Sequence, residues 1–151
     1  MQKIIAFDMD GTIVDLYGVN GWLAMLQNES TIPYIVAKPL YKMTTLNQIC
    51  NELKRHGYKI VVITWGSKNA SQEYNAQIAN VKQEWLKRYG FPYDDFYLQP
   101  YGTLKNQAIN LIDGDKILVD DNERVRKKWI GETIDATNDI LTELKKLYKE
   151  D

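Results

Sequence analysis

Two pairs of aspartates, Asp8 with Asp10 and Asp120 with Asp121, each follow a short apolar run in the sequence. Neighbouring carboxylates repel one another unless a cation or a shared proton compensates their charge. Their oxygens are the hard ligands that Mg²⁺ takes, together with water and substrate phosphate. One such carboxylate can attack phosphorus, and a second can protonate the leaving oxygen. The pattern therefore indicates a magnesium-dependent phosphoryl-transfer site.

The elements that must position these aspartates alternate between strands and helices. Apolar β-branched runs predict buried strands, and apolar residues at helical spacing predict helices between them. The expected strands are 3–7, 58–64, 95–99, 116–120 and 129–136, and the expected helices are 46–56, 74–89, 103–112 and 138–148. Thr45 with Gln48 predicts a capping box for the first helix, and Thr103 is the expected cap of the third. The alternation predicts an α/β protein, with a three-layer α/β/α Rossmann-like core and a mostly parallel five-stranded sheet.

The carboxyl ends of the predicted strands carry the polar residues. Asp8 and Asp10 follow the first strand, Thr64 ends the second, and Asp120 and Asp121 end the fourth. In open α/β sheets, ligands bind beyond the carboxyl ends of the strands, so we expect these side chains to meet at one edge. A single aspartate at a strand end more simply caps a turn or helix, whereas two acidic pairs at one edge favour a site.

Composition limits the class of protein. The chain has 151 residues, with 44% hydrophobic, 26% charged and a formal net charge of −1, which predicts a single domain over 1–151. No apolar stretch approaches the roughly 20 residues of a membrane span, and the early acid Asp8 argues against a signal peptide. With one cysteine, these features favour a cytoplasmic protein without a membrane partner. The near-zero charge gives no reason to expect a general nucleic-acid binder.

The motifs around these residues resemble those of the haloacid-dehalogenase-like (HAD) superfamily, in the expected order. The first motif is FDMDGTIV at 7–14, the second is VVIT at 61–64, and the fourth is ILVDD at 117–121. Lys105 resembles the third motif, a lysine at the start of the helix before the fourth strand. The resemblance spans residues 3 to about 121.

The resemblance implies a role for each motif residue. Asp8 would be the nucleophile that forms an aspartyl phosphate, and Asp10 would be the general acid/base. Thr64 would donate a hydrogen bond to the transferring phosphoryl group. Mg²⁺ would be held by Asp8, by the backbone carbonyl of Asp10 and by Asp121, with Asp120 binding directly or through water. A second aspartate in the first motif resembles the phosphatase and phosphomutase branch of the superfamily.

Two lysines compete for the third motif. Lys105 would neutralise charge on the phosphoryl group and hold Asp8 ionised. Lys116 also precedes the fourth strand, but it lies at the amino end of that strand, away from the expected site. We therefore prefer Lys105, while the sequence alone leaves the choice between them open.

Residues 15–44 fill a slot where members of this superfamily carry a cap domain. About thirty residues are too few for a full α/β cap, so we expect a minimal helical cap and an open site. The insert carries Tyr17 and Trp22, and Trp65 directly follows the second motif. Aromatic rings near a phosphate site can stack on a base. They would suggest a nucleotide substrate, and the layout resembles the small 5′(3′)-deoxyribonucleotidases of this superfamily. Packing of a small core is the simpler explanation of each single ring.

The expected function is a magnesium-dependent phosphatase, a phosphoric monoester hydrolase acting on nucleoside monophosphates or similar small phosphate esters. One alternative is a phosphatase acting on nucleic-acid 3′ or 5′ ends, for which the four basic side chains within 124–128 would suit contacts to a phosphate backbone. A solvated helix face explains the same cluster more simply. The other alternative is a module that binds a phosphorylated ligand without turnover. Such a module would not need both Asp8 and Asp10.

Overall fold

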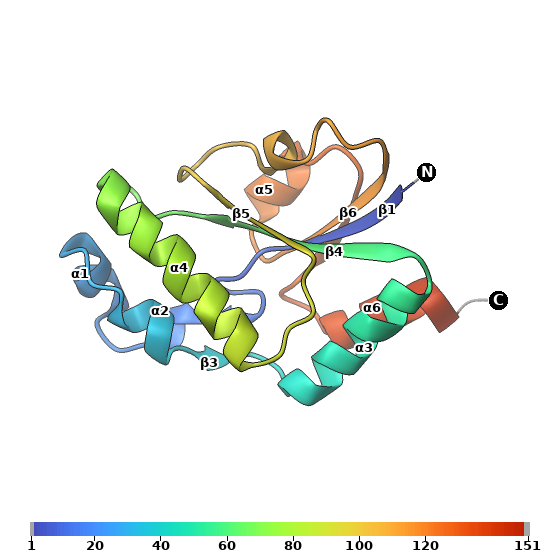
Figure 1. Cartoon of the computed structure of the whole chain (residues 1–151), viewed down its shortest axis with the longest axis horizontal. Coiled ribbons are helices and arrows are strands. Elements are labelled where there is room, and N and C mark those ends of the chain that lie inside the picture. Colours follow the sequence, from blue (N-terminus) through green and yellow to red (C-terminus); the bar gives the residue numbers. More distant parts are fainter. Residues whose placement is uncertain (1, 150–151) are drawn as a thin grey trace.

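The computed structural model, which describes residues 2–149, has a five-stranded parallel sheet between two layers of helices (Figure 1). The strands lie in the order β5-β4-β1-β6-β7, and every neighbouring pair is parallel. Their bounds are β1 Gln2–Phe7, β4 Tyr58–Trp65, β5 Asp95–Gln99, β6 Gly114–Asp120 and β7 Glu132–Asp135. The predicted Rossmann-like α/β fold is confirmed.

The register of the central strand β1 with its neighbours determines where the residues after these strands lie. Its last four residues are fully buried, as expected of a parallel strand covered on both faces. Phe7 lies opposite Val62 of β4 and Val119 of β6. Because the three strands are parallel and in this register, the residues that follow them emerge side by side at the carboxyl edge.

Helices cover the two faces of the sheet unequally. On one face, α3 (Met43–Arg55) and α6 (Ile140–Lys149) pack with part of α4 (Gln72–Arg88) over the larger apolar cluster. On the other face, α5 (Glu123–Lys128) and a short 3₁₀ helix, Lys105–Ala108, cover a smaller cluster. Both faces are therefore closed, and the polar residues can gather only at the edges.

Helix α4 extends beyond the sheet and carries the insert. Its Trp85 and Leu86 pack in the cluster beneath the sheet, whereas Tyr74 and Ile78 pack with residues of the insert. The insert contains β2 Val14–Asp15, a 3₁₀ helix Leu16–Gly18, α1 Trp22–Gln27, α2 Ile32–Val36 and β3 Lys38–Pro39. It forms a small helical lobe beside the carboxyl edge of the sheet (Figure 1).

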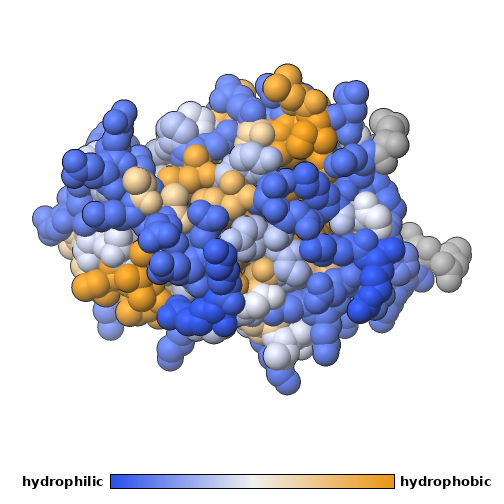
Figure 2. All heavy atoms as spheres, in the orientation of Figure 1, coloured by the Kyte–Doolittle hydropathy of each residue, from blue (hydrophilic) through white to orange (hydrophobic). Residues whose placement is uncertain are grey.

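The surface of the molecule is mostly polar, with limited apolar patches (Figure 2). One of these lies over α2, where Ile32, Ile35 and Val36 are exposed. None of the helices within residues 2–149 is long and apolar enough to span a bilayer.

Two local predictions about helix caps were wrong. Helix α3 begins at Met43 after Lys42, so Thr45 lies inside its first turn, where its backbone N–H already donates to the Lys42 carbonyl. The expected helix 103–112 shrinks to the 3₁₀ turn at 105–108, and Thr103 donates its hydroxyl back to Pro100. Leu111, inside the expected helix, is 96% exposed.

The predicted last strand is also shorter than expected. Only Glu132–Asp135 pairs with β6, whereas Trp129 lies in the cluster under α5. The Trp129 indole N–H donates to the backbone carbonyl of Lys116 at 3.2 Å. Its apolar side chain therefore serves helix packing, which periodicity alone does not distinguish from a strand.

Candidate active site

A tight turn after β1 positions the first two aspartates. The backbone N–H groups of residues 12–14 all donate to the Met9 carbonyl, at 2.9–3.1 Å. Gly11 adopts a φ of +82°, and a Cβ at this position would collide with the Asp121 carboxylate. A glycine here therefore lets the turn and the end of β6 approach each other closely.

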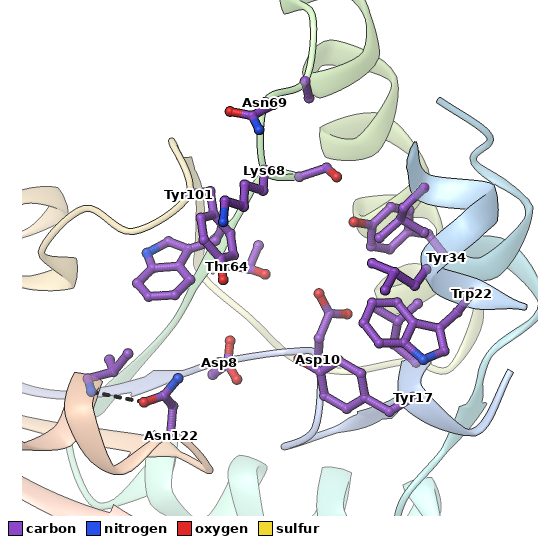
Figure 3. A pocket seen from close by; sticks show the side chains of 18 of the residues that line it. Asp8, Asp10, Tyr17, Trp22, Tyr34, Thr64, Lys68, Asn69, Tyr101 and Asn122 are labelled. Carbon is purple, nitrogen blue, oxygen red and sulfur yellow. Dashed lines mark hydrogen bonds between the residues drawn. The ribbon is translucent and has the colours of Figure 1, made fainter. Parts of the chain in front are cut away.

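A cavity of about 410 Å³ lies at this edge of the sheet (Figure 3). The strand ends form its floor, and the insert and the loop 66–70 before α4 form its rim. All nine residues proposed from the sequence line it, namely Asp8, Asp10, Tyr17, Trp22, Thr64, Trp65, Lys105, Asp120 and Asp121. The structure thus brings together every residue of the predicted site.

Lys105 joins two of the carboxylates. Its Nζ donates to Asp8 Oδ1 at 2.9 Å and to Asp120 Oδ2 at 2.7 Å, and the side chain is buried. Burial alone would lower the pKa of Lys105, but the two carboxylates outweigh this effect and raise it. Lys105 is therefore a fixed positive charge beside Asp8. Lys116 pairs with Ile4 near the other end of β1 and does not line the cavity.

A second buried lysine, Lys82 of α4, was not predicted. It is 1% exposed, and its Nζ donates to Thr64 Oγ1 at 2.7 Å, to Asp10 Oδ2 at 3.0 Å and to the Trp65 carbonyl at 3.1 Å. These contacts use all three donors of the ammonium group. Because Thr64 Oγ1 accepts from Lys82, its own hydrogen is free to donate into the cavity.

The sequence did contain a signal for Lys82. It lies four residues after Ile78 and three before Trp85, so it shares the helix face that these two apolar residues bury. A lysine inside an apolar stripe requires a partner for its charge. That requirement points to a carboxylate, although it does not indicate which one.

Thr12 is a further unpredicted contact of the aspartates. Its Oγ1 lies 3.2 Å from Asp8 Oδ2 and 3.3 Å from Asp121 Oδ1, and the residue is fully buried. It belongs to the first motif and contacts Asp121 of the fourth. Its hydroxyl therefore links the two carboxylates that must lie close together to share a metal ion.

The burial of the aspartates changes their acidity. Burial raises the pKa of the Asp10 carboxyl, although the adjacent Lys82 ammonium acts in the opposite direction. Burial, followed by the charge of Asp8, raises the pKa of Asp121 to about 7. Asp121 can therefore hold a proton near neutral pH, and the raised pKa of Asp10 favours the protonated form that a general acid needs.

The donor set fits a divalent cation. Asp8, Asp120 and Asp121 offer carboxylate oxygens that lie within 4.8 Å of one another. Both Asp120 oxygens already accept hydrogen bonds, one from Lys105 and one from the backbone N–H of Asn122 at 2.9 Å. Both Asp8 oxygens also accept, from Lys105 and from Thr12. Within the described residues only Asp121 keeps a carboxylate oxygen, Oδ2, without a hydrogen bond, so Asp121 is the best placed of the three for direct coordination.

The charges around the cavity floor also fit such a cation. Four aspartates face the two ammonium groups of Lys82 and Lys105, so full ionisation leaves two negative charges uncompensated. Lys82 engages Oδ2 of the Asp10 carboxylate. The backbone carbonyl of Asp10 is the metal ligand that the resemblance implies. An ion held here would meet only oxygen ligands, a set typical of Mg²⁺.

Aromatic rings form opposite walls of the cavity. Tyr17 and Trp22 of the insert pack edge to face with ring centroids 5.0 Å apart, and Trp65 and Tyr101 form a second pair at 5.1 Å. In Figure 3, Asp8 lies between Tyr101 on one side and Tyr17 and Trp22 on the other. The Trp65 indole N–H donates to the carbonyl of Thr103 at 3.0 Å, which fixes this ring. None of these four rings is fully buried, although Trp65 and Trp22 also pack against apolar clusters of the protein.

Comparison with known proteins supports the fold. No protein-family model matches the chain, and no curated protein sequence matches it. Among solved structures, the D,D-heptose 1,7-bisphosphate phosphatase from Burkholderia thailandensis is similar, with a TM-score of 0.58 and 13% sequence identity over 99% of this chain and 100% of that one. At this identity the likeness concerns the fold. The chain therefore shares the overall α/β fold of this phosphatase.

Proposed function

We propose that this chain is a magnesium-dependent phosphatase that hydrolyses phosphate monoesters through an aspartyl phosphate on Asp8. The observation that carries the proposal is the double contact of Lys105 with Asp8 and Asp120, in a cavity that also holds Asp10. A binding module would need the positive charge but not a second carboxyl group that transfers a proton. The fold shared with a phosphatase also supports the proposal.

In the first step, a carboxylate oxygen of Asp8 attacks phosphorus. Lys105 holds Asp8 Oδ1 and places a positive charge where the phosphoryl oxygens gain negative charge. Thr64 donates its free hydroxyl hydrogen to one of these oxygens. When bound, Mg²⁺ would offset charge between the phosphoryl group and the carboxylates Asp8 and Asp121.

Asp10 completes the proton transfers. In its protonated form it gives a proton to the leaving oxygen as the ester bond breaks, and as a carboxylate it then takes a proton from the water that hydrolyses the aspartyl phosphate. Lys82 holds Asp10 Oδ2, which leaves the other oxygen for these transfers. The water oxygen ends on inorganic phosphate, and Asp8 is regenerated.

The aromatic walls support nucleoside monophosphates as substrates. A nucleobase offers a flat face to rings on either side of the cavity, and stacking contributes about 1–3 kcal/mol per base. Trp22 and Tyr17 lie on the insert, so the proposed cap would contribute to this contact. The cavity of about 410 Å³ lies within the range of small-molecule sites.

Phosphate release tests the proposal. Purified protein with Mg²⁺ should hydrolyse p-nitrophenyl phosphate and release phosphate from a panel of nucleoside monophosphates. Asp8→Asn should abolish turnover because an amide oxygen is a poor nucleophile, while circular dichroism should show an intact fold. Glu143→Gln on the exposed surface of α6 is the matched control and should keep the wild-type rate. Turnover retained by Asp8→Asn would exclude Asp8 as the nucleophile.

A further inference from the structure

A second, smaller chamber of about 230 Å³ adjoins the active-site cavity. Trp65, Tyr101 and Lys105 line both chambers, so the second opens directly beside the reacting groups. The proposed chemistry does not use this chamber. Its outer side is formed by α5 and by the segment between β5 and the 3₁₀ turn at 105–108.

The two chambers have opposite electrostatic character. Five carboxylates line the active-site cavity, at residues 8, 10, 29, 120 and 121. Within residues 2–149, none lines the second chamber, whose charged residues are Lys105, Arg124 and Lys128. Since both Asp8 and Asp120 compensate Lys105, the charge of the second chamber comes from Arg124 and Lys128. An anion is the complementary ligand for such a chamber.

The structure sorts the four basic residues of α5 into different roles. Arg126 donates to the Asp120 carbonyl at 3.0 Å and pairs with Asp135, so it supports the strand ends. Lys127 pairs with Glu123 on the solvent side of α5. Arg124 and Lys128, four residues apart, share the face that lines the chamber. Neither forms an ion pair within the described part of the chain.

Asn122 provides a neutral donor between the two chambers. Its carboxamide oxygen accepts from the backbone N–H groups of Arg124 and Val125, at 2.9 and 3.2 Å. The carboxamide is thereby held with its oxygen toward α5, and its NH₂ group is available to a ligand. Figure 3 shows that its amide nitrogen points toward Asp8. Asn122 lines both chambers. A ligand with one end in each chamber can therefore contact Asn122.

We propose that this chamber is a phosphate subsite, and that the substrate is a nucleotide carrying a second phosphate on its ribose, held there by Arg124 and Lys128. The inference rests on the proposed function and names its substrate class. In the bound substrate the scissile phosphate lies beside Asp8. The substrate then passes Trp65 and Tyr101, so that the second phosphate lies in the chamber. Both a free nucleoside bisphosphate and the phosphorylated end of a nucleic-acid strand present this chemistry.

Turnover rates measure the preference for a substrate with a second phosphate. With Mg²⁺, the wild-type protein should show a kcat/KM about tenfold higher for adenosine 3′,5′-bisphosphate than for adenosine 5′- or 3′-monophosphate, because the second phosphate makes charge-assisted contacts. In the double variant Arg124→Gln/Lys128→Gln the ratio should fall toward one. Lys127→Gln removes the same type of charge from another face of α5 and should keep the wild-type ratio. Higher ionic strength should reduce the preference, since these cations are exposed.

Binding measurements test the phosphate subsite independently of catalysis. In Asp8→Asn with Mg²⁺, calorimetry should give a tighter Kd for the bisphosphate than for either monophosphate, and the Arg124→Gln/Lys128→Gln changes should remove this difference. If the wild-type protein hydrolyses nothing but Asp8→Asn shows this pattern, the subsite stands and the proposed function fails. If the wild-type protein hydrolyses both substrates equally well, the proposed function stands and the subsite is overturned.

Dinucleotides distinguish the two sources of the second phosphate. A 5′- or 3′-phosphorylated dinucleotide that shares the preference for the bisphosphate assigns the subsite to strand ends. A preference restricted to the bisphosphate assigns it to free nucleotides. In either case the preference must depend on Arg124 and Lys128, and a double variant that keeps the wild-type ratio overturns the inference.

Discussion

At the scale of single residues, two buried lysines organise the site in different ways. Lys105 joins Asp8 to Asp120, and Lys82 joins Asp10 to Thr64. Each ammonium group thus sets the position of two groups that come from different strands. Removing one partner of a buried ion pair is costly because the remaining charge loses its compensation.

Lys82→Met tests the importance of the second lysine. Methionine fills a similar volume but leaves Asp10 without its cation, so we expect stability to fall on the order of 3 kcal/mol. We also expect kcat to fall by roughly 100-fold, because the carboxyl and hydroxyl groups lose their orientation. Urea denaturation and steady-state kinetics measure the two effects.

Lys87→Met is the matched control, since Lys87 is an exposed lysine on the same helix. It should leave both stability and kcat close to the wild-type values. If Lys82→Met has equally small effects, the hydrogen bonds of Lys82 do not contribute to the site in solution.

The contrast between the two lysines explains what could be predicted from sequence. Asp8, Thr64 and Asp120 follow apolar strands, and the topology of parallel sheets places such residues together whatever the details of packing. Lys105 was found through its order among the motifs. Lys82 lies in mid-helix, and its partners are determined by how α4 crosses the sheet edge, which no local pattern encodes.

At the scale of elements, α4 connects the catalytic edge to the insert. Ser71 accepts from the Tyr74 N–H at 3.1 Å and caps the helix, while its own hydroxyl donates to Glu29 at 2.7 Å. The Tyr74 hydroxyl donates to the Ser30 carbonyl at 2.6 Å. The start of α4 is therefore tied to the end of α1, and the helix carrying Lys82 is held at both its sheet end and its insert end.

Ser71→Ala should weaken this connection. The change removes the cap of α4 and one of the two hydrogen bonds to Glu29, so we expect the free energy of unfolding to fall by about 1 kcal/mol. Urea denaturation measures the change. The neighbouring variant Gln72→Ala, on the exposed first turn, should be close to neutral. Equal stabilities of the two variants would show that the Ser71 cap makes no net contribution.

The misassigned elements show where local patterns are insufficient. The spacing of Leu104, Ala108 and Ile112 suits a helix, yet the chain makes one 3₁₀ turn there because Lys105 must extend inward to two carboxylates. Tertiary contacts of one charged side chain thus outweigh helical propensity. The preceding strand β5, which contains two aromatic residues, was predicted with its observed bounds.

At the scale of the whole molecule, the formal net charge of −1 conceals a local excess of negative charge. Four aspartates meet two lysines at one sheet edge, and the basic face of α5 lies beside them. Such a concentration of carboxylates opposes folding when all of them are ionised. The stability of the metal-free protein should therefore depend on pH through this site.

Asp121 determines the direction of that dependence. Burial, the charge of Asp8 and that of Asp120 raise its pKa to about 7. The resulting stabilisation is fully present below the ordinary pKa of an aspartate and is lost as pH rises through about 7, because the unfolded chain ionises this group more readily. A divalent cation binds the ionised form, so its contribution to stability should grow over the same range.

We therefore expect Mg²⁺ to raise Tm more at pH 8 than at pH 6, as measured by differential scanning calorimetry at constant ionic strength. In Asp121→Asn, the Mg²⁺-induced shift should be small and nearly independent of pH, since the titrating ligand is gone. Asp139→Asn changes an exposed aspartate far from the cavity and should keep the wild-type pattern. Equal shifts at the two pH values in the wild-type protein would mean that Asp121 is already ionised without the metal. A full shift in Asp121→Asn would mean that the ion binds elsewhere.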